Sequence, residues 1–206
     1  MKLVPSKWQA NILRAPTAAY VIGIALIALS ATVIYISNDH LLLAQESSTL
    51  EVNVSGRQRM LSQKIALSAE IVRNGNAAIA DAKYQRELLS NCANLMEWAH
   101  QALLSRDKDA LMATEAVGVT CNEVAEVDLG LPMGKMSADL SASFFAGQPY
   151  LNSTLSMYLA LTRLAASGDA SPSDYKQLQV LAQGDLVNLL NNLTYAFQVE
   201  GERSIA

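Results

Sequence analysis

The chain has 206 residues, of which 51% are hydrophobic and 17% charged, and its formal net charge is −4. A mildly acidic chain without a basic run, a zinc-ligand spacing or a glycine-rich phosphate loop gives no indication of nucleic-acid or nucleotide binding. Aromatic residues make up only 6%, whereas leucine and alanine are abundant. This composition favours helices over sheets, and the length allows one domain plus a membrane segment.

The N-terminal segment is predicted to span a membrane. Residues 16–36 carry no charge, and at about 1.5 Å per residue they are long enough to cross a hydrocarbon core of about 30 Å. Tyr20 and Tyr35 lie near its ends, as interfacial anchors do. Lysines and arginine precede the segment and Asp39 follows it. The positive-inside rule therefore predicts a cytoplasmic N-terminus and an extracytoplasmic chain after about residue 37.

A cleaved signal peptide is the main alternative for this segment. Its apolar run exceeds the usual signal core of about 7–15 residues, and the polar residues 37–40 make a poor cleavage site. A buried core helix fits less well, because no face of the segment is polar. The predicted organisation is a cytoplasmic N-terminus (1–14), a single visible transmembrane helix in the inner (cytoplasmic) membrane (15–36) and an extracytoplasmic domain (37–206).

Four long amphipathic helices are predicted in the remaining chain. The first continues from the membrane segment to the turn signal Asn74-Gly75-Asn76, and the second covers residues 77–105. The third runs from 149–150 to 167–169. The fourth begins at Ser171, with Pro172 in its first turn, and continues to about residue 203. Such helices pack best as an antiparallel bundle, so the predicted fold is all-α.

An irregular excursion of the chain is predicted between the second and third helices, at about 106–148. Residues 109–117 and 137–145 could each form a short helix within it. Cys92 lies on the second helix and Cys121 in the excursion, and the chain has no other cysteine. Outside the cytoplasm the two either form a disulfide, which would fasten the excursion to the bundle, or remain buried free thiols.

Residues 52–66 are predicted to present two faces of the first helix. One is an apolar seam with steps of seven and four residues: Leu43, Leu50, Val54, Leu61, Ile65 and Val72. The second combines small side chains with one arginine: Val52, Ser55, Gly56, Arg59, Ser62, Gln63 and Ala66.

The second face suggests a place where another helix comes close. Small side chains permit close approach, and a glycine inside a helix costs roughly 1 kcal/mol relative to alanine, which suggests a packing reason for Gly56. A guanidinium between two helices, here that of Arg59, offers bidentate donors to an oxygen-rich anion. The alternative, which composition alone favours, is that Arg57, Arg59 and Lys64 form a solvated helix face.

The segment from Asn53 to Gln63, Asn-x-Ser-Gly-Arg-Gln-Arg-Met-Leu-Ser-Gln, resembles the signature of the N-terminal domain of type IV pilus methyl-accepting chemotaxis transducers (PilJ-type). It is also similar to the periplasmic segment of nitrate/nitrite sensor histidine kinases, where Asn-x-Ala-Gly is followed by Arg-Met. In those kinases the arginine before the methionine binds nitrate where two subunits meet, and Arg59 is the matching residue. Ser55 replaces the alanine of the sensor kinases.

The resemblance implies the ligand-sensing domain of a bacterial transmembrane receptor that works as a homodimer. It implies that a small anion such as nitrate or nitrite is bound at the dimer interface, and that a helix shift is passed across the membrane. The residues expected to form the site are Arg59, Gly56, Met60, Asn53 and Arg57. Receptors of this kind cross the membrane again and carry a signalling module inside the cell, so the chain is expected to be the front part of a longer protein.

Two other functions remain open. The domain could bind a pilus or envelope protein through residues 106–148 without a small ligand, or it could anchor a downstream module. Enzymatic activity, metal ions and cofactors are not expected. His40 and His100 lack a second ligand at metal-binding spacing, and neither a nucleophile elbow nor a paired-carboxylate site is recognisable.

Overall fold

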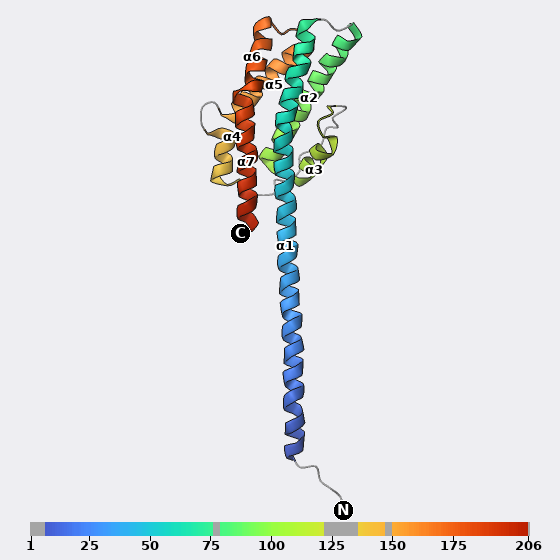
Figure 1. Cartoon of the computed structure of the whole chain (residues 1–206), viewed down its shortest axis with the longest axis vertical. Coiled ribbons are helices and arrows are strands. Elements are labelled where there is room, and N and C mark those ends of the chain that lie inside the picture. Colours follow the sequence, from blue (N-terminus) through green and yellow to red (C-terminus); the bar gives the residue numbers. More distant parts are fainter. Residues whose placement is uncertain (1–6, 76–78, 122–135, 147–149, 206) are drawn as a thin grey trace, which may run out of the picture. The chain divides into compact units, whose positions relative to one another are not determined.

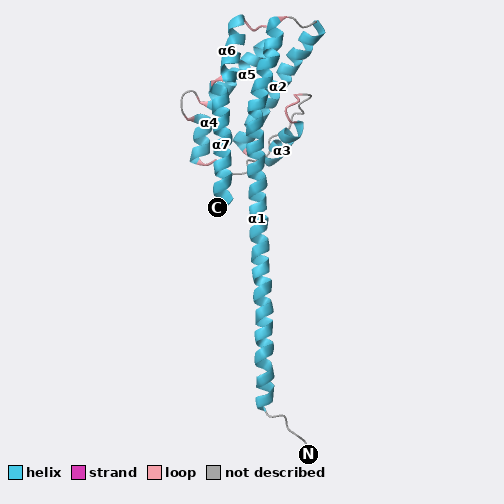
Figure 2. Ribbon diagram, in the orientation of Figure 1, coloured by secondary structure: helices cyan, strands magenta, loops and turns pink. Residues whose placement is uncertain are grey.

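The computed structural model describes residues 7–75, 79–121, 136–146 and 150–205, and every regular element in these ranges is a helix (Figure 2). The first three are α1 (Lys7–Asn74), α2 (Ile79–Ser105) and α3 (Lys108–Val117). The other four are α4 (Ala138–Phe145), α5 (Leu151–Ser167), α6 (Pro172–Gln183) and α7 (Asp185–Ile205). The predicted all-α fold is confirmed.

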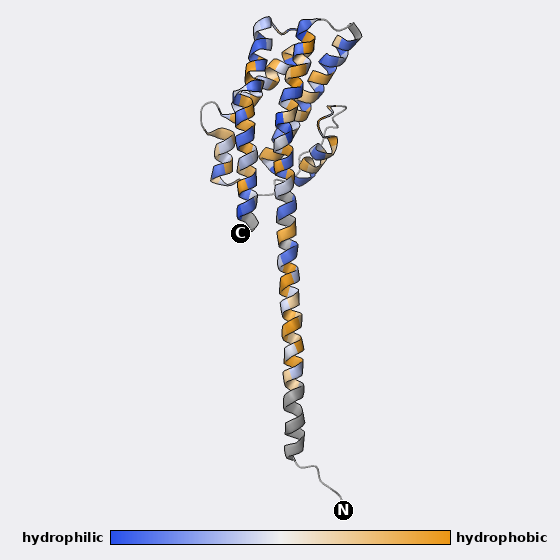
Figure 3. Ribbon diagram, viewed as in Figure 1, coloured by the Kyte–Doolittle hydropathy of each residue, from blue (hydrophilic) through white to orange (hydrophobic). Residues whose placement is uncertain are grey.

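The chain divides into two compact units, residues 1–44 and 45–206. In the first unit α1 contains Ala18–Asp39, a stretch of 22 residues and mean hydropathy 2.3 that is long and apolar enough to cross a membrane. Its large apolar side chains are exposed, and in Figure 3 most of the ribbon along this stretch has the colours of hydrophobic residues. In length and composition this stretch agrees with the predicted transmembrane helix.

The second unit is an antiparallel bundle built from residues 45–74 of α1, together with α2, α5 and the consecutive helices α6 and α7 (Figure 1). Near one end of the bundle, Ser48 on α1 lies against Gly201 on α7. Near the other end, Glu70 on α1 accepts a hydrogen bond from Gln179 on α6. The short helix α3 packs on α2, and α4 packs on α5 and α7.

The core of the bundle contains the predicted apolar seam of α1. Its buried members are Leu50, Val54, Leu61 and Ile65, whereas Val72 is partly buried. The side chain of Leu43 lies outside the described residues. Burial of a side chain of this size stabilises the folded state by about 1.5–3 kcal/mol relative to leaving it exposed. The seam is therefore a main source of the stability that holds α1 to the rest of the bundle.

The fourth predicted helix is in fact two helices. It begins as predicted, with Ser171 and Asp174 forming a capping box, but α6 ends at residue 183 and α7 starts at Asp185. Gly184 between them has φ −125° and ψ −107°, outside the helical region. A Cβ at this position would lie 3.1 Å from the carbonyl oxygen of Val180. The prediction of one continuous helix was wrong because the apolar periodicity runs on through the break.

Two short helices occupy the predicted excursion at almost the predicted positions. The side chain of Asp107 accepts a hydrogen bond from the amide of Ala110 at the start of α3, and Ser137 caps α4 in the same way. Aspartate and serine at such positions satisfy amides that have no partner within the helix. The rest of the excursion, residues 122–135 and 147–149, lies outside the described residues.

Cys92 and Cys121 form a disulfide in this structure, and both are buried. Of the two states that the sequence left open, the structure therefore contains the bonded one. Cys92 is on α2, and Cys121 lies just after α3, so the bond attaches the start of the excursion to the bundle.

Candidate functional site

The signature segment, residues 53–63, lies midway along the part of α1 that belongs to the bundle. The helix divides its side chains into two groups because positions three and four apart share a face. The buried group comprises Val54, Ser55, Gln58, Leu61 and Ser62. The exposed or half-buried group comprises Asn53, Gly56, Arg57, Arg59, Met60 and Gln63. Only the second group is available to a ligand or another chain.

Two serines of the predicted small-residue face are not on the surface. Ser55 and Ser62 are both fully buried. Their hydroxyls donate to backbone carbonyls one turn earlier on α1, at 2.9 and 2.8 Å. The carbonyl oxygen of Ser62 also accepts a hydrogen bond from the hydroxyl of Tyr158 on α5, at 2.6 Å. Burial raises the pKa of Tyr158, which therefore remains a proton donor. These serines join α1 to the core rather than to a ligand.

Asn53 and Arg57, both predicted ligand residues, contact Glu115 on α3. The amide nitrogen of Asn53 donates to Oε1 of Glu115 at 3.0 Å, and Nη2 of Arg57 lies 3.7 Å from the same oxygen. Arg57 also donates to the backbone carbonyl of Glu115. Farther along, Nζ of Lys64 donates to two carbonyls just after α3, at 2.9 and 2.8 Å. These three side chains fasten α3 to α1.

Arg59 points to the other side of α1, toward α7. Its side chain is exposed, and Nη1 donates to the side-chain oxygen of Asn191 at 3.1 Å. Arg59 has no carboxylate within ion-pair distance among the described residues. A guanidinium carries five N–H donors and a charge that a neutral amide does not balance. Most of its capacity to bind an anion is therefore unused in the described ranges of the chain.

Beside Arg59 lies an exposed strip of α1, made of Gly56, Met60, Gln63 and Leu67, which we call the α1 strip. Met60 is 51% exposed and Leu67 65%, which is high for large apolar side chains in the middle of a bundle. A Cβ built on Gly56 would meet no atom within 4 Å. None of the described residues makes the close approach predicted at Gly56, and the space beside this glycine is open to another helix.

A cleft of about 490 Å³ borders the α1 strip on the side of α6 and α7. It is lined by Gln63, Ala66, Leu67, Glu70, Gln179, Ala182, Gln183 and Val187. A larger open cleft, of about 1040 Å³, is lined by Lys83, Arg86 and Arg163 among others, and none of the predicted site residues lines it. Arg59, Gly56 and Met60 line neither cleft and lie on an open helix face, whereas Asn53 lines two smaller clefts.

No group of three or more histidine, cysteine, aspartate or glutamate side chains in the described part of the chain could hold a metal ion. His100 is buried, and its Nε2 lies 3.0 Å from the side-chain oxygen of Asn152 on α5. Burial lowers the pKa of His100, so this side chain is neutral at physiological pH and serves the core.

Residues 41–128 match the family model described as type IV pili methyl-accepting chemotaxis transducer N-term. The matched stretch contains the signature segment, α2 and α3, so it extends well beyond the residues that first suggested this family, and the predicted resemblance is confirmed. Over these residues the chain is similar to the N-terminal sensor or transducer domain of chemotaxis-type receptors. Such domains belong to membrane receptors, in agreement with the apolar stretch of α1.

Neither a curated protein nor a solved structure matches the chain. The family match carries no information about nitrate or about a dimer. The structure adds to the match that the two signature arginines differ: Arg57 is paired with Glu115 on α3, and Arg59 has no carboxylate partner in the part of the chain that the structure describes.

Proposed function

We propose that this domain senses a small oxygen-rich anion, with nitrate and nitrite as first candidates, between the Arg59 side chains of two identical chains. The domain would act on the periplasmic side of the inner membrane. The proposal rests on the exposure of Arg59 and on the partners of its guanidinium. It is exposed, bonded to one neutral amide on α7 and unpaired with any carboxylate in the described residues. Bidentate guanidinium donors suit planar anions such as nitrate.

Pairing along the α1 strip supports this proposal. In a two-fold dimer the same patch meets itself, so Arg59 of one chain would lie near its counterpart. Gly56 would permit close contact between the helices, and Met60 and Leu67 would bury apolar surface that is now exposed. Two guanidinium groups repel each other, and an anion between them removes the repulsion. Anion binding and tight pairing would therefore favour each other.

The contact between Arg59 and Asn191 suggests how binding would reach α7. A guanidinium that turns toward an anion at the dimer interface weakens its hydrogen bond to Asn191. Because Asn191 lies on α7, the contact between α1 and α7 would differ between the free and bound states. A ligand shifts an equilibrium only through such a difference between two states.

Protein recognition without a small ligand is the second candidate. It is supported by Met112 on α3 and Phe145 on α4, which are 47% and 52% exposed. These residues lie in the predicted excursion, away from the α1 strip. A domain of this second kind would bind no anion, and its contacts in cells would concentrate on α3 and α4.

Calorimetric titration of nitrate and nitrite into the 206-residue chain in lipid nanodiscs tests the proposal. We expect one anion per two chains, and we expect Arg59→Ala to weaken binding by about 10- to 100-fold, since hydrogen bonds to charged groups contribute about 1.5–3 kcal/mol. Arg163→Ala is the matched control, because Arg163 is also exposed but is paired with Glu97. Equal affinity of Arg59→Ala and the wild type for the bound anion would refute the site.

A further inference from the structure

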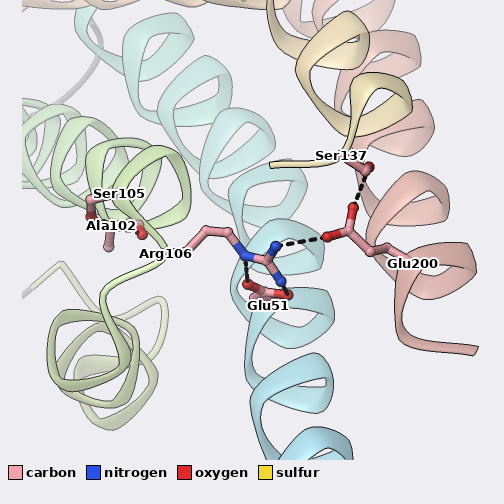
Figure 4. A network of polar contacts seen from close by, with 6 residues as sticks. All are labelled: Glu51, Ala102, Ser105, Arg106, Ser137 and Glu200. Atoms are coloured by element: carbon pink, nitrogen blue, oxygen red, sulfur yellow. Dashed lines mark hydrogen bonds and ion pairs between the residues drawn. The ribbon is translucent and has the colours of Figure 1, made fainter. Parts of the chain in front are cut away.

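A cluster of charged side chains away from the α1 strip joins four elements at one end of the bundle (Figure 4). Arg106, between α2 and α3, donates from Nε and Nη2 to the two carboxylate oxygens of Glu51 on α1, at 2.6 and 3.1 Å. Its Nη1 donates to Oε1 of Glu200 on α7 at 2.7 Å. The other oxygen of Glu200 accepts a hydrogen bond from Ser137, the cap of α4, at 2.5 Å. One guanidinium thus connects α1 with α7.

The cluster is largely shielded from water. The side chain of Glu51 is 2% exposed, that of Arg106 17% and that of Glu200 20%. Burial raises the pKa of Glu51, and the bidentate contact with Arg106 opposes this effect. Because the two carboxylates share one cation, the guanidinium of Arg106 supplies the counter-charge for both. Charge-assisted hydrogen bonds of this kind are about twice as strong as neutral ones.

The backbone of Arg106 is unusual for a residue with a side chain. Its φ is +55°, in the left-handed region that non-glycine residues rarely adopt. Arg106 lies at the corner where α2 ends and Asp107 begins to cap α3. A residue held in this conformation needs support from its surroundings. Here the support is the three hydrogen bonds of the guanidinium to Glu51 and Glu200.

Close packing between α1 and α7 adjoins the ion pairs. A Cβ on Gly201 would lie 1.8 Å from Oγ and 2.8 Å from Cβ of Ser48. Ser48 lies one helical turn before Glu51, and Gly201 directly follows Glu200. Rotation of α7 would therefore turn a side chain into α1, so this contact fixes the rotation of α7 while Arg106 fixes its position along the bundle.

We propose that Arg106 is a latch that holds α7 against α1, and that its release allows α7 to move between two arrangements. Helix shifts in signalling proteins are about 1–2 Å. A shift of about 2 Å at right angles to the 2.7 Å contact with Glu200 would lengthen it to about 3.4 Å, beyond the hydrogen-bonding limit of about 3.2 Å. The latch is therefore either closed or open. This proposal concerns residues outside the α1 strip and does not depend on any ligand.

Two other ion pairs near this end of the bundle cannot substitute for the latch. Lys108 lies 3.2 Å from Glu46, and Arg203 lies 2.7 Å from Asp139. The members of the second pair are 64% and 74% exposed, and exposed pairs contribute little. The second pair also joins α7 to α4 rather than to α1, and the first joins α1 to α3.

Spin-label distances between α1 and α7 test the latch. Labels at Thr49→Cys and Asn192→Cys, both exposed, would attach specifically because both native cysteines are in the disulfide. The labelled 206-residue chain is diluted with unlabelled protein, so that only distances within one chain are seen. We expect one narrow distance in the otherwise unchanged chain. Glu200→Ala should add a second distance or shift the mean by about 1–2 Å.

The matched control is Glu202→Ala, which makes the same charge change on the same helix. The side chain of Glu202 accepts a hydrogen bond from Gln198 on α7 and forms no ion pair among the described residues. We expect the distances of this control to equal those of the unchanged chain. Arg106→Gln should reproduce Glu200→Ala; if it does not fold, Glu200→Ala decides alone, because it keeps the pair between Arg106 and Glu51. Identical distances in Glu200→Ala and Glu202→Ala would refute the latch.

Discussion

Arg106→Gln should lower the free energy of unfolding by about 3–5 kcal/mol, the usual effect of removing one partner from a buried ion pair. Arg106 is the only cation in contact with Glu51 and Glu200 among the described residues, and Glu51 is almost completely buried. The substitution would leave two carboxylates facing each other without a counter-charge. Thermal or chemical unfolding of the 206-residue chain in detergent, followed by circular dichroism, measures the change.

Glu51→Gln is the informative comparison. It removes the most deeply buried charge but leaves Arg106 paired with Glu200, so we expect a change of no more than about 1 kcal/mol. The effect of Arg106→Gln should also shrink as the pH falls below 7. Burial has already raised the pKa of Glu51, and a proton taken up by the folded state relieves the unpaired charge. Equal losses in the two variants, or a loss independent of pH, would contradict this account of the cluster.

Loss of the disulfide is the second change that we expect to lower the stability of the protein strongly. The double variant Cys92→Ala/Cys121→Ala should be less stable by about 3–4 kcal/mol, because the bond constrains a loop of about 30 residues in the unfolded chain. The sequence separation of the two cysteines is 29. For a domain of this size, such a loss corresponds to a decrease in Tm of about 6–16 °C. Scanning calorimetry of the oxidised wild type and the double variant measures it.

Reduction of the wild type provides an independent control. Dithiothreitol should lower the Tm of the wild type toward that of the double variant and leave the double variant unchanged. If the oxidised wild type and the double variant melted at the same temperature, the bond between Cys92 and Cys121 would not contribute to the stability of the bundle.

Helix positions were largely predictable from local signals. The glycine turn after Asn74 ends α1, the cap at Ser171 begins α6, and the short helices α3 and α4 begin within one residue of their predicted starts. These signals act over a few residues, so the local sequence contains them completely. The break at Gly184 escaped prediction because glycine tolerates both a helix and a break, and the apolar pattern continues on both sides.

The directions of polar side chains on α1 were less predictable. Glu51, Ser55, Gln58 and Ser62 follow one another at steps of four and three, as solvent-facing residues of a helix do, yet all four are buried. Their burial depends on how wide a face of α1 the neighbouring helices cover, which no local pattern shows. The same limit applies to Arg59, because its partner Asn191 is 132 residues away in the sequence.

The contacts of Arg106 with Glu51 and Glu200 could not be predicted from the sequence for a different reason. Arg106 and Glu51 are 55 residues apart, and Arg106 and Glu200 are 94 apart. Their meeting depends on the left-handed backbone at Arg106 and on the return of α7 beside α1. The glutamate at position 51, next to the apolar seam, was the one available signal, because a carboxylate beside core residues requires a partner.

Oxidative crosslinking of Met60→Cys tests most directly whether two chains meet along the α1 strip with an anion between their Arg59 side chains. The account predicts rapid formation of a covalent dimer that nitrate or nitrite accelerates, and loss of that acceleration when Arg59→Ala is added. Met157→Cys on α5 is the control, since Met157 is 42% exposed and Met60 51%. Crosslinking of Met60→Cys no faster than of Met157→Cys, with or without the anion, would contradict the account.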